Sequence, residues 1–293
     1  MNNIKYYCFC EKSFRKKHYF INHKNNCEVF KLHEQNEIQK TLFKKYSYTS
    51  LNHIEYINNV PKVVFICWFG IKNNEIPLMS QPRFNALNNL LDNIGVPVII
   101  ITELNYKFFI KKAYPLHKAF EYLSGVHKSD YMRCYLLLHY GGGYHDIKFR
   151  NKSLENAWDD NNWTKDNNIW MYGRREKKKT SIGYPPGMKY IANEFNKLVT
   201  MGWIICKPNT LYLKDLVNQI EEKLDYHIDN LIKYPAKLPG GYYSDKPFDL
   251  VPEKSYPIRW LEILGEIFHP LMLKYNEHIK FGLPDANKRI SYK

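Results

Sequence analysis

Two runs of apolar residues constrain the fold more than any other feature. The segment VPKVVFICWFG spans residues 60–70, VPVIIITE spans 96–103, and RFNALNNLLDNI, which has helical spacing, lies between them. Uninterrupted apolar runs of this length are typical of strands that are buried on both faces of a parallel sheet. The strand–helix–strand order therefore predicts an α/β fold.

The chain is rich enough in apolar residues to build a large core. Of its 293 residues, 44% are hydrophobic and 16% aromatic, which predicts one large domain, alone or with a small appendage, and argues against disorder. No window approaches the roughly 18 consecutive apolar residues of a membrane-spanning helix. The start MNNIKYYCFCEK is unlike a signal peptide. We therefore expect a cytoplasmic protein with no membrane span.

The chain is strongly basic, with a formal net charge of +14. A charge of this sign favours acidic partners such as phosphate, a nucleotide, nucleic acid or an anionic membrane. The plainer explanation is the Lys- and Asn-rich usage of an AT-rich genome. The charge alone does not separate the two explanations.

Half of the cysteines gather near the start of the chain. Cys8, Cys10 and Cys27 lie in the first tenth, whereas the other three are scattered among apolar residues. This distribution is not a disulfide framework. It indicates a reducing compartment and a local metal site.

The stretch YYCFCEKSFRKKHYFINHKNNC, residues 6–27, resembles a C2H2-type zinc finger in its Cys-Cys-His-Cys variant. The resemblance implies one structural zinc ion held by Cys8, Cys10, His23 and Cys27, with aromatic residues forming the small core around it. The C-x-C spacing is one residue shorter than the usual knuckle, so His18 is an alternative to Cys8. The competing interpretation is a basic tail with incidental cysteines.

The finger-like segment also carries much positive charge, from Lys12, Arg15, Lys16, Lys17 and Lys24. Nucleic-acid binding through one finger would be weak, because a single module buries little surface. A role in protein interaction or localisation is at least as consistent. We expect a zinc-finger-like module over residues 1–30, a polar, partly helical linker over 31–58 and the large domain over 59–293.

The stretch SDYMRCYLLLHYGGGYHDIKFR, residues 129–150, places charged residues around a glycine turn. Ser129 is a candidate helix N-cap, and Asp130 and Arg133 then share a helical face. The glycines are expected to end that helix and allow a tight turn. The next strand would carry Asp146 and Lys148 on one side, because side chains alternate along a strand. The four charged groups are therefore expected to converge.

These motifs resemble the glycosyltransferases of the capsular polysaccharide synthesis group, over residues 60 to about 285. That group is related to the D-x-D sugar transferases and, more distantly, to the glucosyltransferase domains of large clostridial toxins. The matching positions are Ser129, Asp130, Arg133, Gly142, Gly143, Asp146, the segment 61–64 and Trp68.

The resemblance implies a GT-A-like, Rossmann-like domain that binds a nucleotide-sugar donor and transfers the sugar, with retention, to a glycan or protein acceptor. It implies that Trp68 stacks on the base. Asp130 and Arg133 would hold the sugar hydroxyls and the ribose or phosphate, within a donor motif that includes Gly142 and Gly143. Asp146 would bind Mn²⁺ or Mg²⁺ at the diphosphate.

The chain departs from the D-x-D pattern, because it has Asp146-Ile147-Lys148. One carboxylate ligand is lost and a cation is gained on the same strand face. Either Asp146 holds the metal together with groups elsewhere, or Lys148 partly replaces the metal at the diphosphate. Lys148 is therefore a candidate catalytic residue together with Asp130 and Asp146.

Two C-terminal segments are further candidates. Glu262, Glu266 and, in part, His269 share one face of a helix-like run ending at Pro270, so a metal-ligand or catalytic role is open and His269 is a candidate ligand of the divalent cation. For Glu262, ordinary helix surface is slightly favoured. The turn-rich segment LPGGYYSDKPFD, residues 238–249, is a candidate lid over the donor.

Two functions remain open from the sequence. The favoured one is a hexosyltransferase-type enzyme that uses a nucleotide-sugar. The alternative is a nucleic-acid-associated zinc-finger protein whose second domain is a degenerate transferase. The glycine–acid motif favours the enzyme, whereas the net charge and the change from D-x-D to D-x-K favour the alternative.

Overall fold

The protein consists of two compact units, Met1–Tyr46 and Ser47–Lys293. The computed structural model describes residues 5–70, 76–159, 163–238 and 255–286. The candidate lid, 238–249, lies outside the described residues apart from Leu238.

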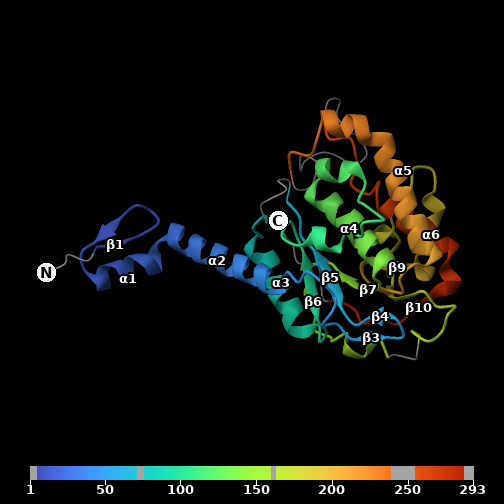
Figure 1. Ribbon diagram of the computed structural model, residues 1–293, viewed down its shortest axis with the longest axis horizontal. Coiled ribbons are helices and arrows are strands. Elements are labelled where there is room, and N and C mark those ends of the chain that lie inside the picture. The colour runs from blue at the N-terminus through green and yellow to red at the C-terminus, as the bar shows by residue number, and fades with distance from the viewer. Residues whose placement is uncertain (1–4, 71–75, 160–162, 239–254, 287–293) are drawn as a thin grey trace. The chain divides into compact units, whose positions relative to one another are not determined.

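The smaller unit is a short hairpin followed by two helices (Figure 1). Its elements are β1 (Tyr6–Tyr7), β2 (Ser13–Phe14), α1 (Lys17–Asn26) and α2 (Glu28–Tyr46). Glu11, in the left-handed region at φ 67°, turns the chain between the two strands. The buried cluster at the centre of this unit consists of Cys8, Cys27 and Phe30.

The larger unit is built around a six-stranded sheet in the order β10-β8-β9-β7-β5-β6. Three pairs, β10–β8, β7–β5 and β5–β6, are parallel, and β9 runs antiparallel to both of its neighbours. The strands are β5 (Val64–Cys67), β6 (Val98–Ile101), β7 (Gly142–His145), β8 (Met171–Arg175), β9 (Val199–Cys206) and β10 (Ile279–Phe281); β3 (Tyr56–Ile57) and β4 (Val60–Pro61) form a separate hairpin.

Helices cover this sheet, and three of them pack on one another in sequence order. α4 contacts β5, β7 and α5; α5 contacts α6; and α6 contacts β9 (Figure 1). The helices of this unit are α3 (Gln81–Asn93), α4 (Gly125–His139), α5 (Leu211–Lys233) and α6 (Gly265–Lys274). Short 3-10 helices lie at Tyr106–Phe109, Lys118–Tyr122, Glu155–Ala157, Lys179–Ser181, Lys189–Lys197 and Asn276–His278.

The predicted α/β fold is confirmed. β5 and β6 are parallel neighbours joined through α3, and every residue of both strands is buried. The mixed, mostly parallel sheet is that of a Rossmann-like domain, and a Cys/His cluster lies in the unit before it. In the described part of the chain, no helix is both long enough and apolar enough to cross a bilayer.

Two local predictions around the glycines are wrong. α4 begins earlier than expected: Ser124 is its N-cap and accepts a hydrogen bond from the His127 backbone N–H, whereas Ser129 lies inside the helix. Gly142 and Gly143 are residues of β7 rather than of a turn, and this strand ends at His145, before Asp146. The strand begins at Gly142 because Gly142 already pairs with Cys206 of β9. This pairing is a long-range contact, so the local sequence pattern did not predict it.

Candidate functional site

A cavity of about 490 Å³ opens where β5 and β7 end, at the carboxyl edge of the parallel strands. Open α/β sheets bind ligands at this edge, and the volume is in the range of ligand pockets. Its walls include Trp68, Asp130, Arg133, Asp146, Met201 and Trp260.

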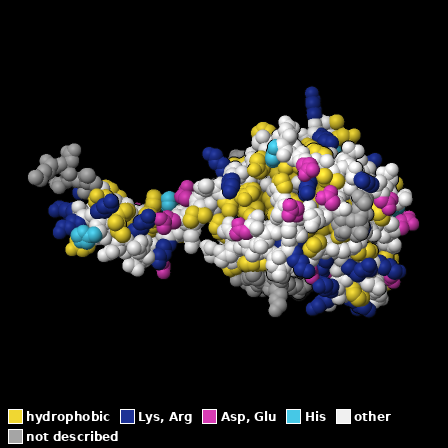
Figure 2. Space-filling model, turned by 90° about the horizontal axis from the view of Figure 1, so that it is seen from below, with side chains coloured by type: hydrophobic (Ala, Val, Ile, Leu, Met, Phe, Trp, Pro, Cys, Tyr) yellow, Lys and Arg dark blue, Asp and Glu magenta, His cyan; other side chains and the backbone are white. Residues whose placement is uncertain are grey.

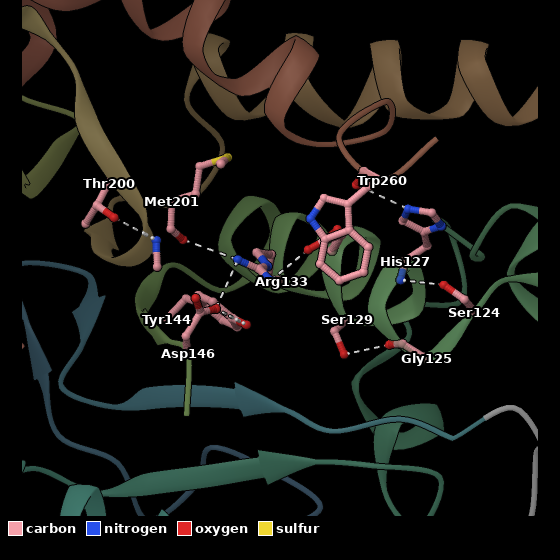
Figure 3. Close-up of polar contacts among 12 residues, drawn as sticks. Ser124, Gly125, His127, Ser129, Arg133, Tyr144, Asp146, Thr200, Met201 and Trp260 are labelled. Carbon is pink, nitrogen blue, oxygen red and sulfur yellow. Dashed lines mark hydrogen bonds and ion pairs between the residues drawn. The ribbon is translucent and has the colours of Figure 1, made fainter. Parts of the chain in front are cut away.

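Arg133 joins two carboxylates on the floor of the cavity (Figure 3). Its Nη2 lies 2.7 Å from Asp130 Oδ1, and its Nη1 lies 3.4 Å from Asp146 Oδ1. Nη1 also donates to the Met201 carbonyl at 3.2 Å, and the guanidinium lies 4.2 Å from the Tyr144 ring centroid. The convergence of Asp130, Arg133 and Asp146 is therefore present in the folded chain.

The Asp146 carboxylate is contacted by two cations and one hydroxyl donor. Lys148 Nζ lies 3.0 Å from its Oδ2, and the Tyr144 hydroxyl donates to its Oδ1 at 3.1 Å. Burial acts to raise the pKa of Asp146, but the charges of Lys148 and Arg133 outweigh burial and leave the pKa below its usual value. The carboxylate is therefore ionised at neutral pH and is held between two cations.

At Asp130, burial outweighs the effect of the neighbouring cation on the pKa. Burial raises the pKa of its carboxyl to about 6, and the nearby Asp146 charge adds to this, although Arg133 acts in the other direction. Two carboxyl groups in one cavity thus differ in acidity. Such divergence is common where proteins bind or transform ligands, because desolvation and neighbouring charge both act there.

β9 supplies a contact that the sequence analysis missed. Gly202 accepts a hydrogen bond at 2.6 Å from the Asp146 backbone N–H. A Cβ on Gly202 would lie 3.0 Å from Lys148 Nζ and 3.1 Å from Asp146 Oδ2. The glycine therefore leaves room for the Asp146–Lys148 pair. An isolated glycine in the strand-like TMGWIIC was the signal that could have indicated a close approach.

Two tryptophans face the cavity from different segments. Trp68, directly after β5, donates from Nε1 to the Pro77 carbonyl at 2.6 Å, and the Arg83 guanidinium lies 5.4 Å from its ring. Trp260 is 37% exposed and had no assigned role from the sequence. Trp260 and Arg133, both labelled in Figure 3, line the same cavity.

Buried polar contacts tie the segment before α6, which bears Trp260, to α4. His127 Nδ1 and the Tyr256 hydroxyl are 2.7 Å apart, and His127 Nε2 lies 3.4 Å from the Trp260 carbonyl. Burial lowers the pKa of His127 to about 4, so this histidine is neutral at physiological pH. The contacts fix the backbone beneath Trp260 at the cavity wall.

Four of the sequence candidates, Gly142, Gly143, Lys148 and His269, do not line the cavity, although Lys148 pairs with Asp146, which does. A Cβ on Gly142 would approach Pro61 and the Val63 carbonyl at 3.2 Å, and one on Gly143 would approach Val64 at 2.9 Å, so the packing of β7 against its neighbours accounts for both glycines. His269 is buried on α6, where its Nδ1 accepts from the Gly183 N–H at 2.9 Å. Burial lowers the pKa of His269 to about 4.

The smaller unit brings Cys8, Cys10, His23 and Cys27 together, with one ligand atom of each within 4.8 Å of the others. The Cys8 and Cys27 sulfurs are 3.6 Å apart, close to the edge of about 3.8 Å that follows from Zn–S bonds of about 2.3 Å in a tetrahedron. The cluster can therefore hold a metal ion such as zinc. His18 is not part of it; its ring lies against Tyr19.

The fold is that of a Rossmann-like protein, with a cavity lined by charged side chains at the carboxyl edge of its sheet. The chain belongs to the capsular polysaccharide synthesis protein family, whose sequence model matches residues 11–196. The description of this family concerns the synthesis of capsular polysaccharides.

A curated protein that is similar to this chain has no described function. An uncharacterized protein of Plasmodium falciparum (isolate 3D7) is 22% identical over 240 residues, which make up 75% of this chain and 24% of that protein. The chain thus spans about a quarter of that relative's length. No solved structure matches the chain.

Proposed function

We propose that the chain is a glycosyltransferase with a GT-A-like domain that moves a sugar from a nucleotide-sugar to a glycan or protein acceptor, with retention at the anomeric carbon. The observation that carries this proposal is the chain of ion pairs that runs from Asp130 through Arg133 to Asp146 in the cavity wall and continues to Lys148 beside it. Residues 59–293 would carry the activity, 1–30 the zinc-dependent module and 31–58 the connection between them.

The donor would lie across this chain of charges. Trp68 would stack on the base, and Asp130 would accept hydrogen bonds from sugar hydroxyls. Cleavage of the sugar–phosphate bond builds negative charge on the leaving nucleoside diphosphate, which preorganised cations stabilise. Arg133 is held in place by two carboxylates and the Met201 carbonyl. Its charge is therefore fixed before the donor arrives.

The residues at the cavity do not by themselves supply a set of ligands for Mn²⁺ or Mg²⁺. Both oxygens of Asp146 face cations or a hydroxyl donor. The described residues contain one group of three or more metal-ligating side chains, and it is the N-terminal Cys/His cluster. We propose that Lys148 and Arg133 provide the charge at the diphosphate that a divalent cation provides in D-x-D enzymes.

Lys148→Ala tests this assignment. If Lys148 serves the diphosphate, the variant should turn over donor more slowly and become more dependent on Mn²⁺ or Mg²⁺, because a cation could then occupy the freed Oδ2 of Asp146. Lys148→Asp should bind the metal more tightly than the wild type. Metal titrations of activity that coincide in wild type and Lys148→Ala would remove Lys148 from the site.

The activity itself is tested by incubating the full chain with a panel of nucleotide-sugars and measuring nucleotide release, with and without candidate acceptors. The proposal expects release from at least one donor and, by NMR of the product, the same anomeric configuration as in the donor. No release from any donor would favour the alternative, a zinc-finger protein whose second domain is degenerate.

A further inference from the structure

A row of cations leads from the edge of the cavity to an exposed loop. We name it the cationic strip and define it as Lys148, Arg174, Lys177, Lys178 and Lys179. Its members come from the segment after β7 and from the end of β8 with the loop that follows it. Lys and Arg side chains also gather at the lower right of the larger unit in Figure 2.

The strip is connected by contacts at its cavity end. Lys148 Nζ lies 5.3 Å from the centroid of the Trp203 ring, and Arg174 Cζ lies 5.4 Å from it. The pairing of β8 with β9 is irregular between Gly173 and Arg175. Irregularities of this kind redirect side chains and are frequent beside active sites. Arg174 is thus placed one tryptophan ring away from the Asp146–Lys148 pair.

Acidic groups neutralise the strip only in part. Arg174 pairs with Asp285 at 3.0 Å and with Glu176 at 3.4 Å, and Lys177 pairs with the same Asp285 at 2.6 Å. Burial raises the pKa of Glu176, although the charge of Arg174 acts in the other direction. Together with Asp146, the ion pairs among the described residues thus set three carboxylates against the five cations of the strip.

The three lysines at the outer end of the cationic strip, Lys177, Lys178 and Lys179, which we call the outer strip, are accessible to a ligand. Lys177, Lys178 and Lys179 are exposed, and Lys179 donates to the Asn193 side chain at 2.9 Å rather than to an acid. Arg174 and these three lysines do not line the cavity. A donor in the cavity would therefore leave the outer strip free for the second substrate.

We propose that the acceptor is an anionic glycan whose phosphate or carboxylate groups lie along the cationic strip, an inference that rests on the proposed transferase function. A hydroxyl of this glycan would face the donor sugar beside Lys148. Its oxygen would form the new glycosidic bond as the sugar–phosphate bond breaks, and its proton would leave with the nucleoside diphosphate. Arg forks and Lys ammonium groups both suit phosphate and carboxylate oxygens. A neutral glycan would offer these cations no negative charge.

The test compares two full-length variants that each lose three charges. Lys177→Gln/Lys178→Gln/Lys179→Gln alters the strip, and Lys12→Gln/Arg15→Gln/Lys17→Gln alters the N-terminal unit. The fluorescent probes are a phosphomannan, a polygalacturonate, neutral dextran and duplex DNA, and binding is followed by polarisation at two salt concentrations. Calorimetry with nucleoside diphosphates measures the donor site separately.

We expect wild type to bind at least one anionic glycan, more weakly at high salt, and to bind dextran far less. The strip variant should lose at least about tenfold in affinity, whereas the N-terminal variant should change by less than about twofold. Phosphomannan or polygalacturonate as the better ligand identifies the anionic group.

Equal losses in both variants, no loss in the strip variant, equal binding of dextran, or tighter binding of DNA than of either glycan would each overturn the inference. The nucleoside diphosphates separate its failure from that of the proposed function. If they do not bind while the strip still selects anionic glycans, the transferase proposal fails, and with it the role of the strip as an acceptor site.

Discussion

The two units of the chain bury their residues in different ways. α1 has no buried residue, and the centre of the smaller unit consists of Cys8, Cys27 and Phe30. In the larger unit, apolar residues from the sheet and from α4, α5 and α6 form one continuous core. We therefore expect the smaller unit to need a bound metal for its fold, and the continuous core of the larger unit to offset the cost of burying charged side chains in the cavity.

The largest effect is expected from removing the metal. Structural zinc contributes about 10–16 kcal/mol in zinc-finger peptides, so a chelator or His23→Asn should unfold the smaller unit while the larger unit keeps its thermal transition. His18→Asn is the matched control, since His18 is on the same helix but outside the cluster. Zinc content by mass spectrometry and hydrogen exchange over residues 5–46 check this. An unchanged exchange pattern in metal-free protein would contradict it.

Asp146→Asn should have the next largest effect. The substitution keeps the shape but removes the charge that holds Lys148 and faces Arg133. Donor turnover should fall by about 10²-fold or more if this group of charges stabilises the leaving diphosphate. Asp159→Asn is the control, because the Asp159 side chain is 58% exposed and pairs with Lys62 at 3.8 Å. Equal turnover in Asp146→Asn and wild type would disprove the assignment.

Substitutions of two tryptophans, one at the cavity and one in the core, should affect nucleotide binding and stability differently. Trp68→Ala should weaken nucleotide binding by about 1–3 kcal/mol if the ring stacks on the base, with little loss of stability because Trp68 is only partly buried. Trp158→Phe should do the reverse, since Trp158 is fully buried and donates to the Pro61 carbonyl at 2.8 Å. Calorimetry and thermal unfolding measure both. The same nucleotide affinity in Trp68→Ala and wild type would make Trp68 a core residue.

The smallest effect concerns pH. Because burial raises the pKa of Asp130 from 3.8 to about 6, this group stabilises the fold most below pH 3.8, and its contribution is lost as the pH rises through about 6. Donor affinity should increase over the same range, as ionised Asp130 becomes a stronger acceptor for sugar hydroxyls. Asp130→Asn should flatten both profiles between about pH 4 and 6. A variant that keeps the wild-type profiles would assign the titration to another group.

Local patterns account for the parts of the molecule that the sequence predicted. The apolar runs at 60–70 and 96–103 report burial directly, and the i, i+3 spacing of Asp130 and Arg133 fixes their shared face on α4. The ligand spacing likewise predicted the Cys/His cluster.

The features that the sequence did not predict depend on contacts between residues far apart in the chain. The antiparallel insertion of β9 between β7 and β8 brings Gly202 to Asp146, and residues far along the chain bring Trp260 to α4. Neither arrangement leaves a periodic trace in the sequence. The β9 pairing also includes Gly142 and Gly143 in β7, so of the three consecutive glycines only Gly141, at φ 73°, makes the turn after α4.

Hydrogen exchange with and without a nucleotide-sugar is the most direct test of the claim that the donor occupies the charged cavity. Exchange should slow in the first half of α4, around Asp146 and at residues 200–203, and should not change in residues 5–46. Protection confined to residues 5–46, or absent from α4 and β9 with every donor tried, would contradict it.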